Sequence, residues 1–236
     1  MTVPLPLQGI EVRCSVCGRT TTVFRSPGNN DEFGNITLFA LNGCINNLYF
    51  RPDDCFCDIE CCEHCHYVNT DITKKLYDKV NTVIQDPEYR DIFKSNCDDF
   101  GAHEWVAFLY LLDNCDDDTF TEERLTEIYS IAYLQLLDAI NQVLDTDVTT
   151  TEQLHLEKIK SEYTLRFLQH LQKSQNLIDK LRLVELYRRN GDFTKASETI
   201  AEIENKEESI FGVLKKQKEL VSNKDSRDDG FPYRIY

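Results

Sequence analysis

Cysteine is the residue type whose spacing in this sequence points most directly to chemistry. Of ten cysteines in 236 residues, eight fall between positions 14 and 65. In Cys14-Ser-Val-Cys17 and in Cys62-Glu-His-Cys65, two residues separate two thiols, a spacing that lets both sulfurs bind one metal ion. We call residues 14–18 the first knuckle and residues 62–66 the second. Because two knuckles complete a tetrahedral shell, the sequence predicts one structural zinc ion bound by Cys14, Cys17, Cys62 and Cys65.

A four-thiolate site of this kind is closed, so it stabilises a fold and leaves no coordination position for a catalytic water. Iron in a cluster is the main rival metal. A thioredoxin-like redox pair also uses Cys-x-x-Cys, but it belongs to a βαβ unit that this sequence does not indicate. Unligated structural cysteines explain one such pair more readily than two. Clustered cysteines without an export signal also favour a metal over disulfides.

Further candidate ligands surround the second knuckle and leave a second metal site open. They are Cys44, Cys55, Cys57, Cys61, His64 and His66. Another ion could be ligated by Cys55, Cys57 and Cys61 with His64 or His66, and Cys61 could replace Cys62 in the first site. Their spacing contains no third knuckle. We therefore favour the alternative that Cys44, Cys55 and Cys57 are small buried side chains or partly exposed thiols.

Short strands are the elements that must position the two knuckles. Residues 1–73 are rich in Asn, Gly, Pro and Thr, and β-prone segments occur at 9–13, 20–24, 36–41 and 47–50. From about Asp71 the apolar spacing becomes helical. Helices are predicted over 73–85, 88–95, 99–113, 121–145, 151–173, 175–190, 193–204 and 207–222. We therefore expect an α+β fold, with a split zinc ribbon at 1–73, a helical domain at 74–222 and a tail at 223–236.

One segment of the helical part has a more specific pattern. The helix that ends near Asn190 is followed by Gly191, and the next helix begins near Asp192. The small side chain of Ala196 would let the two helices approach closely. This pattern resembles a tetratricopeptide repeat, in which paired helices pack in this way. The alternative is one continuous helix through Gly191 with Ala196 exposed.

The chain is acidic, with 41 acidic against 26 basic side chains and a net charge of −15. Binding to nucleic acid or to an anionic membrane demands a basic surface, so neither is expected. Residues 97–118 contain seven acidic residues and no Lys or Arg. They could form an acidic docking face, but they lack the spacing of a calcium loop. A solvated loop with helix-capping aspartates is the favoured interpretation.

The remaining sequence features exclude other classes of protein. No stretch approaches about 20 apolar residues, so no membrane span is expected. The segment Met1-Thr-Val-Pro-Leu-Pro lacks the basic start and apolar run of a secretory signal, and we expect a cytoplasmic protein. No nucleophile elbow, phosphate-binding loop, zinc-protease or deaminase motif occurs, so no enzymatic activity is expected.

Taken together, the knuckles and helices resemble a family of uncharacterised bacterial zinc-ribbon proteins with tetratricopeptide-like C-terminal helices. Cys14-Ser-Val-Cys17-Gly18 matches the family's first knuckle, Cys-Pro-x-Cys-Gly. Cys62-Glu-His-Cys65-His66-Tyr67 matches the second in spacing and in Tyr67. Residues 186–196 are similar to its closing repeat. Both knuckle prolines are absent here, and His66 stands where the family has glycine.

From these features we expect a non-catalytic, zinc-binding protein-interaction module, an adaptor or regulator that binds a protein partner of unknown identity through its helices. One alternative is an acidic decoy or immunity-type protein that blocks a basic partner through residues 97–118. Another is an enzyme with an unrecognised site. The sequence leaves the oligomeric state open.

Overall fold

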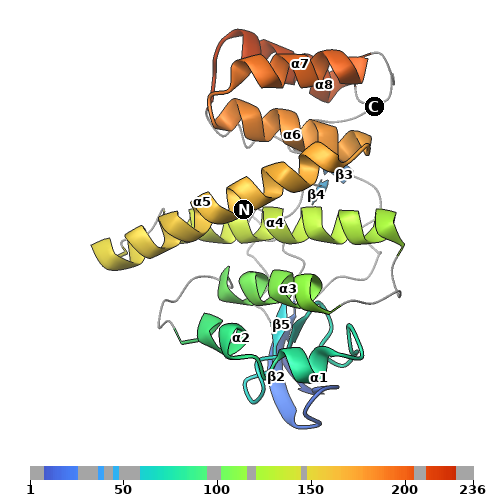
Figure 1. The fold of residues 1–236 in the computed structure, drawn as a ribbon, viewed down its shortest axis with the longest axis vertical. Coiled ribbons are helices and arrows are strands. Elements are labelled where there is room, and N and C mark those ends of the chain that lie inside the picture. Colours follow the sequence, from blue (N-terminus) through green and yellow to red (C-terminus); the bar gives the residue numbers. More distant parts are fainter. Residues whose placement is uncertain are drawn as a thin grey trace. The chain divides into compact units, whose positions relative to one another are not determined.

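A computed structural model describes residues 8–25, 37–39, 45–47, 59–94, 102–115, 121–144, 148–204 and 211–226. In chain order, short antiparallel hairpins come first and helices follow (Figure 1). The predicted α+β fold class is therefore confirmed.

The knuckles are the turns of two hairpins. β1 (Gln8–Arg13) pairs antiparallel with β2 (Thr20–Arg25), and the first knuckle joins them. β5 (Glu60–Cys61) pairs antiparallel with β6 (Val68–Asn69), and the second knuckle joins them. β2 and β5 are in contact, which brings the two hairpins together.

A third hairpin in the described residues pairs β3 (Thr37–Phe39) with β4 (Ile45–Asn47). The predicted strands at 9–13 and 20–24 are confirmed, and β3 lies inside the segment predicted at 36–41. β4 ends at Asn47, where the fourth strand was expected to begin; residues 48–50 lie outside the described part of the chain. The pair β5–β6 was not predicted, because two-residue strands are too short to show an alternating pattern.

Eight helices are described, and seven of them fall within a few residues of their predicted limits. They are α1 (Val80–Val83), α2 (Pro87–Ile92), α3 (Ala102–Asn114), α4 (Glu122–Leu144), α5 (Thr150–Lys173), α6 (Leu177–Arg189), α7 (Phe193–Glu204) and α8 (Phe211–Ser222). α2 begins where expected because the Asp86 side chain accepts a hydrogen bond from the Glu88 amide and Pro87 occupies the first helical position.

The predicted helix at 73–85 is wrong, since only Val80–Val83 is helical. The reason is local competition for backbone groups. The Tyr67 hydroxyl donates to the Lys74 carbonyl (2.9 Å) and accepts from the Leu76 amide (2.7 Å). The Asn69 side-chain amide also donates to the Lys74 carbonyl (3.1 Å). Side chains of the second hairpin thus bind groups that a helix would have used.

The chain divides into two compact units. One contains β1, β2, β5, β6 and α1–α4, with α5 as far as Leu165; the other contains β3, β4, the rest of α5 and α6–α8. The ribbon hairpins therefore belong to the same unit as the first helices. The predicted domain limits, 1–73 and 74–222, remain predictions.

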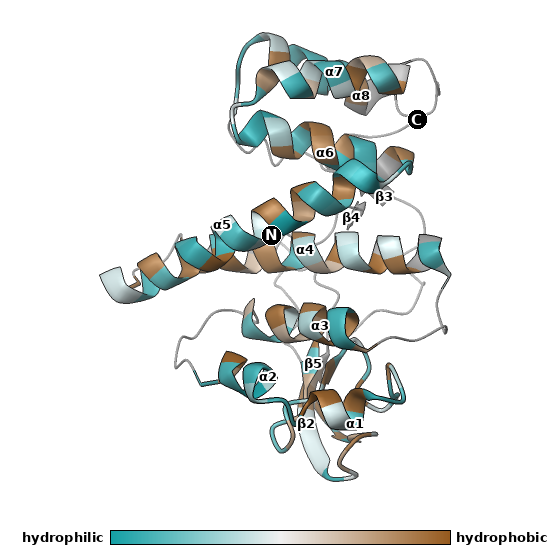
Figure 2. Ribbon diagram, viewed as in Figure 1, coloured by the Kyte–Doolittle hydropathy of each residue, from teal (hydrophilic) through white to brown (hydrophobic). Residues whose placement is uncertain are grey.

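α3 is the central helix of the first unit and contacts α1, α2, α4 and β6. Its buried residues lie on more than one face, and Figure 2 shows its largely apolar character. Trp105, the single tryptophan of the chain, is 3% exposed and meets the Phe108 ring edge-on. The core of this unit therefore extends directly from the β5–β6 hairpin into the helices.

The second unit contains the predicted helical hairpin. α6 ends at Arg189, Gly191 has φ +75°, and α7 begins at Phe193. Ala196 is fully buried and α6 packs against α7. The hairpin is confirmed, and the continuous helix through Gly191 is excluded.

A buried polar network joins α6 to α8. The Glu185 carboxylate accepts hydrogen bonds from Arg188 (2.8 Å), Arg189 (2.6 Å) and Gln217 of α8 (2.6 Å). Arg188 is fully buried and also donates to the Asp225 carbonyl, just beyond α8 (2.5 Å). Burial alone raises the pKa of Glu185, but the charges of Arg189 and Arg188 and the hydrogen bonds outweigh it and lower the pKa. Glu185 is therefore ionised when this unit is folded at neutral pH.

Candidate metal centre

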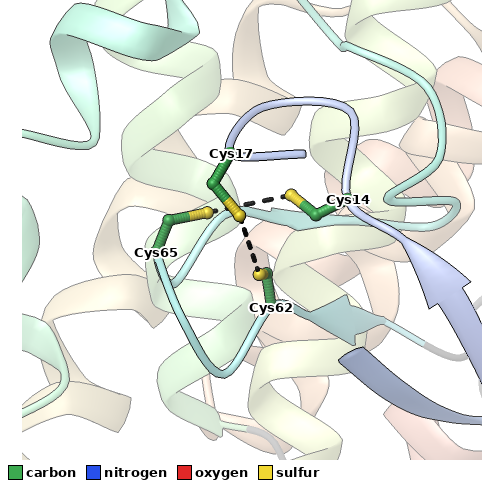
Figure 3. A group of neighbouring side chains, drawn as sticks. All are labelled: Cys14, Cys17, Cys62 and Cys65. Carbon is green, nitrogen blue, oxygen red and sulfur yellow. Dashed lines mark hydrogen bonds between the residues drawn. The ribbon is translucent and has the colours of Figure 1, made fainter. Parts of the chain in front are cut away.

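Four cysteine sulfurs converge from the two knuckles (Figure 3). The Sγ atoms of Cys14, Cys17, Cys62 and Cys65 all lie within 4.8 Å of one another. The Cys14–Cys65 sulfur distance is 3.8 Å and the Cys17–Cys62 distance is 3.7 Å. A regular tetrahedron with metal–sulfur bonds of about 2.3 Å has edges of about 3.8 Å. The two distances are therefore those of a tetrahedral four-thiolate shell around one metal ion.

The first knuckle is a tight turn closed by its own backbone. The Cys14 amide donates to the Arg19 carbonyl (2.9 Å), and the Gly18 amide donates to the Cys14 carbonyl (3.0 Å). The Val16 amide points at the Cys14 sulfur (3.4 Å). Arg13 closes the turn from outside, since its Nε donates to the Gly18 carbonyl (2.9 Å).

The second knuckle repeats this hydrogen-bond pattern. The Cys62 amide donates to the Tyr67 carbonyl (2.9 Å), and the His66 amide donates to the Cys62 carbonyl (2.8 Å). The residue after the second cysteine has a positive φ in both knuckles, +71° at Gly18 and +57° at His66. The two turns thus have the same backbone hydrogen bonds and the same sign of φ at this position. Only the first has glycine there, the residue that adopts a positive φ most readily.

Residues outside the knuckles hold them at the right separation, and the sequence did not single them out. The Ser15 amide and hydroxyl both donate to the Ile72 carbonyl (2.9 Å each). The Ile72 amide in turn donates to the Glu60 carboxylate (3.0 Å), which is 3% exposed. Ile72 is fully buried and so connects the first knuckle to the β5–β6 hairpin. No periodic pattern marks these contacts, because each is made by an irregular segment.

The thiols of the cluster differ in exposure and in acidity. Cys14 and Cys62 are buried, Cys65 is half-buried and Cys17 is exposed. Burial raises the pKa of Cys62 and, together with the nearby Cys14 and Cys62, that of Cys65. At Cys17 the effect of burial is outweighed by hydrogen bonds from the Arg19 backbone and the neighbouring thiols, and the pKa is lowered. Four thiolates at this spacing repel one another, and a bound dication compensates that repulsion.

Three of the candidates for a second metal site lie in the described residues, and none joins a metal-binding group there. Cys62, rather than Cys61, belongs to the cluster. His64 Nε2 lies 2.9 Å from the Thr20 carbonyl, which can only accept, so this nitrogen carries the proton. The His66 ring stacks on Phe93. The other three candidates, Cys44, Cys55 and Cys57, lie outside the described residues.

The predicted acidic stretch is described only in part. Glu104 lies in the first turn of α3, and Asp113 accepts a hydrogen bond from the Tyr129 hydroxyl (2.9 Å). Both residues therefore belong to the helical packing of the first unit. The other five acidic residues lie outside the described residues: Asp98, Asp99, Asp116, Asp117 and Asp118.

None of the helices in the described residues has both the length and the apolar character needed to cross a membrane. No family model, curated protein or solved structure matches the chain. The resemblance to the bacterial zinc-ribbon family therefore remains a prediction. What is shown is a cluster of four cysteines, placed to bind one metal ion, of the kind found in zinc ribbons.

Proposed function

We propose that this chain is a non-catalytic zinc protein in which one Zn²⁺, bound by Cys14, Cys17, Cys62 and Cys65, stabilises a ribbon, and in which α6, α7 and α8 bind a protein partner. The observation that carries the metal assignment is the sulfur geometry, with separations of 3.7 and 3.8 Å across the two knuckles. Thiolates are soft ligands, and a tetrahedron of four sulfurs favours zinc or an iron–sulfur centre over harder cations. The four sulfurs are spaced around a single ion, which argues against a multi-iron cluster, and zinc is the single ion that we propose.

A structural role follows from the number of ligands. Four thiolates fill a tetrahedral zinc shell, so no position is left for an activated water. The two knuckles lie about 50 residues apart in sequence (Cys14 and Cys65 are separated by 51 positions). An ion that joins them adds to the β2–β5 and Ser15–Ile72 contacts in fixing the two hairpins, and its binding free energy becomes folding free energy.

The partner-binding part of the proposal is supported by the arrangement of α6, α7 and α8. Lys180 near the start of α6 pairs with Glu202 near the end of α7 (3.3 Å), as expected for antiparallel helices. Glu185 and Gln217 bond between α6 and α8, as do Arg188 and the Asp225 carbonyl, in an order that makes these helices parallel.

The spacing of these helices adds a quantitative argument. α6 ends at residue 189 and α8 at residue 222, an offset of 33 residues. The tetratricopeptide period is about 34 residues, and in such arrays the first helix of each repeat packs parallel to that of the next. α6 and α7 therefore fit one repeat and α8 the first helix of another. Repeats of this kind present extended surfaces that bind proteins.

The metal assignment is tested by metal analysis of the purified chain with two adjacent serine substitutions. Wild-type protein is expected to contain about one zinc per chain. Cys62→Ser removes a proposed ligand and should lower zinc content and stability markedly. Cys61→Ser changes the neighbouring thiol, which lies outside the cluster, and should retain zinc. A metal-free wild-type chain that is fully folded, or equal zinc loss in both variants, would contradict the assignment.

A further inference from the structure

The second knuckle contacts α2 and the residue that follows it. Two contacts are described, and His66 makes each of them. The His66 ring stacks on Phe93, the residue that follows the last residue of α2, with centroids 4.7 Å apart and planes 20° from parallel. The Tyr89 hydroxyl donates a hydrogen bond to the His66 carbonyl (2.5 Å). Tyr89 is fully buried, so a hydroxyl that lost this partner would be left inside the protein, which is costly.

In the described residues, the contacts noted above for the first knuckle come from irregular segments and strands rather than from a helix. Its left-handed residue is Gly18, which adopts a positive φ without steric cost. The Gly18 carbonyl, the counterpart of the His66 carbonyl, is bound by Arg13 of the same hairpin. His66 adopts the same conformation with a side chain, which is unfavourable for residues other than glycine. The second knuckle therefore needs support from elsewhere. β2 contacts His64 and Glu63, and the side chain and carbonyl of His66 itself are contacted by Phe93 and Tyr89.

From α2 the contacts continue into the centre of the first unit. The Tyr89 ring lies against Phe93 (centroids 5.7 Å apart) and meets Tyr110 of α3 edge-on (5.8 Å). α3 carries Trp105 and contacts β6, the strand that follows the second knuckle. Tyr89 thus contacts both the second knuckle and α3, so a change in the knuckle can alter the packing of α2 on α3.

We propose that α2 links metal occupancy of the cysteine cluster to the packing of the first unit, with Tyr89 and Phe93 as the linking residues. The proposal rests on the zinc site proposed above. Tyr89 and Phe93 act as positioning residues that stabilise the metal-binding form of the second knuckle. Metal binding in turn stabilises the packed position of α2. Because linkage is reciprocal, the factor by which the Tyr89 hydroxyl raises metal affinity equals the factor by which metal stabilises its bond to His66. The ribbon would then act as a metal-responsive control on the neighbouring helices.

The test compares two substitutions that each remove one tyrosine hydroxyl from the same cluster of rings. Tyr89→Phe removes the bond to the knuckle. Tyr110→Phe is the matched control, because the Tyr110 hydroxyl donates to Glu88 (3.5 Å) rather than to a group of the second knuckle. Zinc affinity of the full chain is measured by competition with a chelator of known affinity. We expect about a tenfold loss for Tyr89→Phe, as for other residues that orient metal ligands from outside the shell. Tyr110→Phe should stay within about twofold of wild type.

The second readout is the difference in hydrogen exchange of α2 and α3 between zinc-loaded and zinc-free protein. A tyrosine with only a packing role would not change this difference. In wild-type protein, removing zinc should speed exchange in α2 and α3. In Tyr89→Phe the difference between zinc-loaded and zinc-free protein should shrink by a factor matching the affinity loss. If Tyr89→Phe fails to fold, Phe93→Leu, which keeps an apolar side chain but removes the stacked ring, should lower zinc affinity about threefold.

The outcomes separate this proposal from the zinc site itself. A wild-type chain that binds no zinc overturns the proposed function. A chain that binds zinc, but whose affinity and zinc-dependent exchange are the same in Tyr89→Phe as in Tyr110→Phe, overturns the linkage through α2 alone. If Tyr89→Phe lowers stability equally with and without zinc, Tyr89 is a packing residue and the linkage is likewise excluded.

Discussion

His66 is the residue at which the two knuckles differ most. It has φ +57° where the first knuckle has glycine, and its ring packs on Phe93. A left-handed conformation costs most L-residues about 1–2 kcal/mol, less for Asn and more for β-branched residues. In this conformation the His66 carbonyl accepts from the Tyr89 hydroxyl and the ring stacks on Phe93.

The cost of this conformation is measured by comparing His66→Val with His66→Asn. Both substitutions remove the ring that stacks on Phe93, so their difference isolates the backbone. His66→Val should lower the free energy of unfolding of the zinc-loaded chain by about 1–2 kcal/mol more than His66→Asn. Denaturant unfolding followed by the fluorescence of the buried Trp105 gives both values. Equal stabilities would mean that the left-handed turn relaxes when the ring is removed.

At the residue scale the sequence predicted the cysteines that cluster but not the residues that support them. The knuckle spacing selected four thiols, and the structure brings those four together. Spacing alone left Cys61 and Cys62 as alternatives for one position. The hairpin determines which of the two joins the cluster, because Cys61 is the last paired residue of β5 and Cys62 is the first residue of the turn. The Ser15, Glu60 and Ile72 contacts join segments far apart in sequence, so no local pattern reveals them.

At the scale of secondary structure, the α6–α7 hairpin has one position that controls the approach of its helices. Ala196 is fully buried where α7 meets α6, and Gly191 reverses the chain just before it. A larger side chain at position 196 would have to displace α6, because protein interiors are closely packed.

Ala196→Leu should therefore destabilise the α6–α8 unit by about 1–3 kcal/mol through overpacking. Ala201→Leu, an exposed position on the same helix, is the control and should be nearly neutral. Hydrogen exchange of α6 and α7 in the full chain locates the effect. If the two variants behave alike, the close packing at Ala196 does not contribute to stability.

Elements differed in how well the sequence predicted them. Long helices have enough apolar positions to show a period, and α4, α5 and α7 were placed within a residue or two. The helix expected at 73–85 failed because Tyr67 and Asn69, from the preceding hairpin, bind its backbone instead. These side-chain contacts from the hairpin just before it override the local helix propensity, and the apolar spacing does not reveal them.

At the scale of the whole molecule, the net charge of −15 raises the question of whether a partner is bound by charge or by an apolar surface. The response of binding to salt distinguishes these two modes. A partner bound through an apolar surface of α6–α8 should stay bound when salt is raised, because hydrophobic burial is not screened. A basic partner held by acidic residues should be lost steeply. Affinity capture with the full chain at low and high salt measures this, and we expect retention. Loss of every partner at high salt would favour the acidic decoy over the repeat-type surface.

The split between the two knuckles also has a consequence for the order of events during synthesis. The Cys17 and Cys62 sulfurs lie 3.7 Å apart in the folded chain but 45 positions apart in sequence. A nascent chain that has exposed only the first knuckle offers two thiolates, too few to hold zinc in a closed shell. The entropy lost on closing the intervening loop grows only slowly with its length. The time between exposure of the first knuckle and zinc binding is therefore set by translation of the loop more than by the encounter of the two knuckles. The ribbon is therefore expected to acquire its ion only after Cys65 has left the ribosome, when the residues of α2 that support the second knuckle follow within about 25 positions.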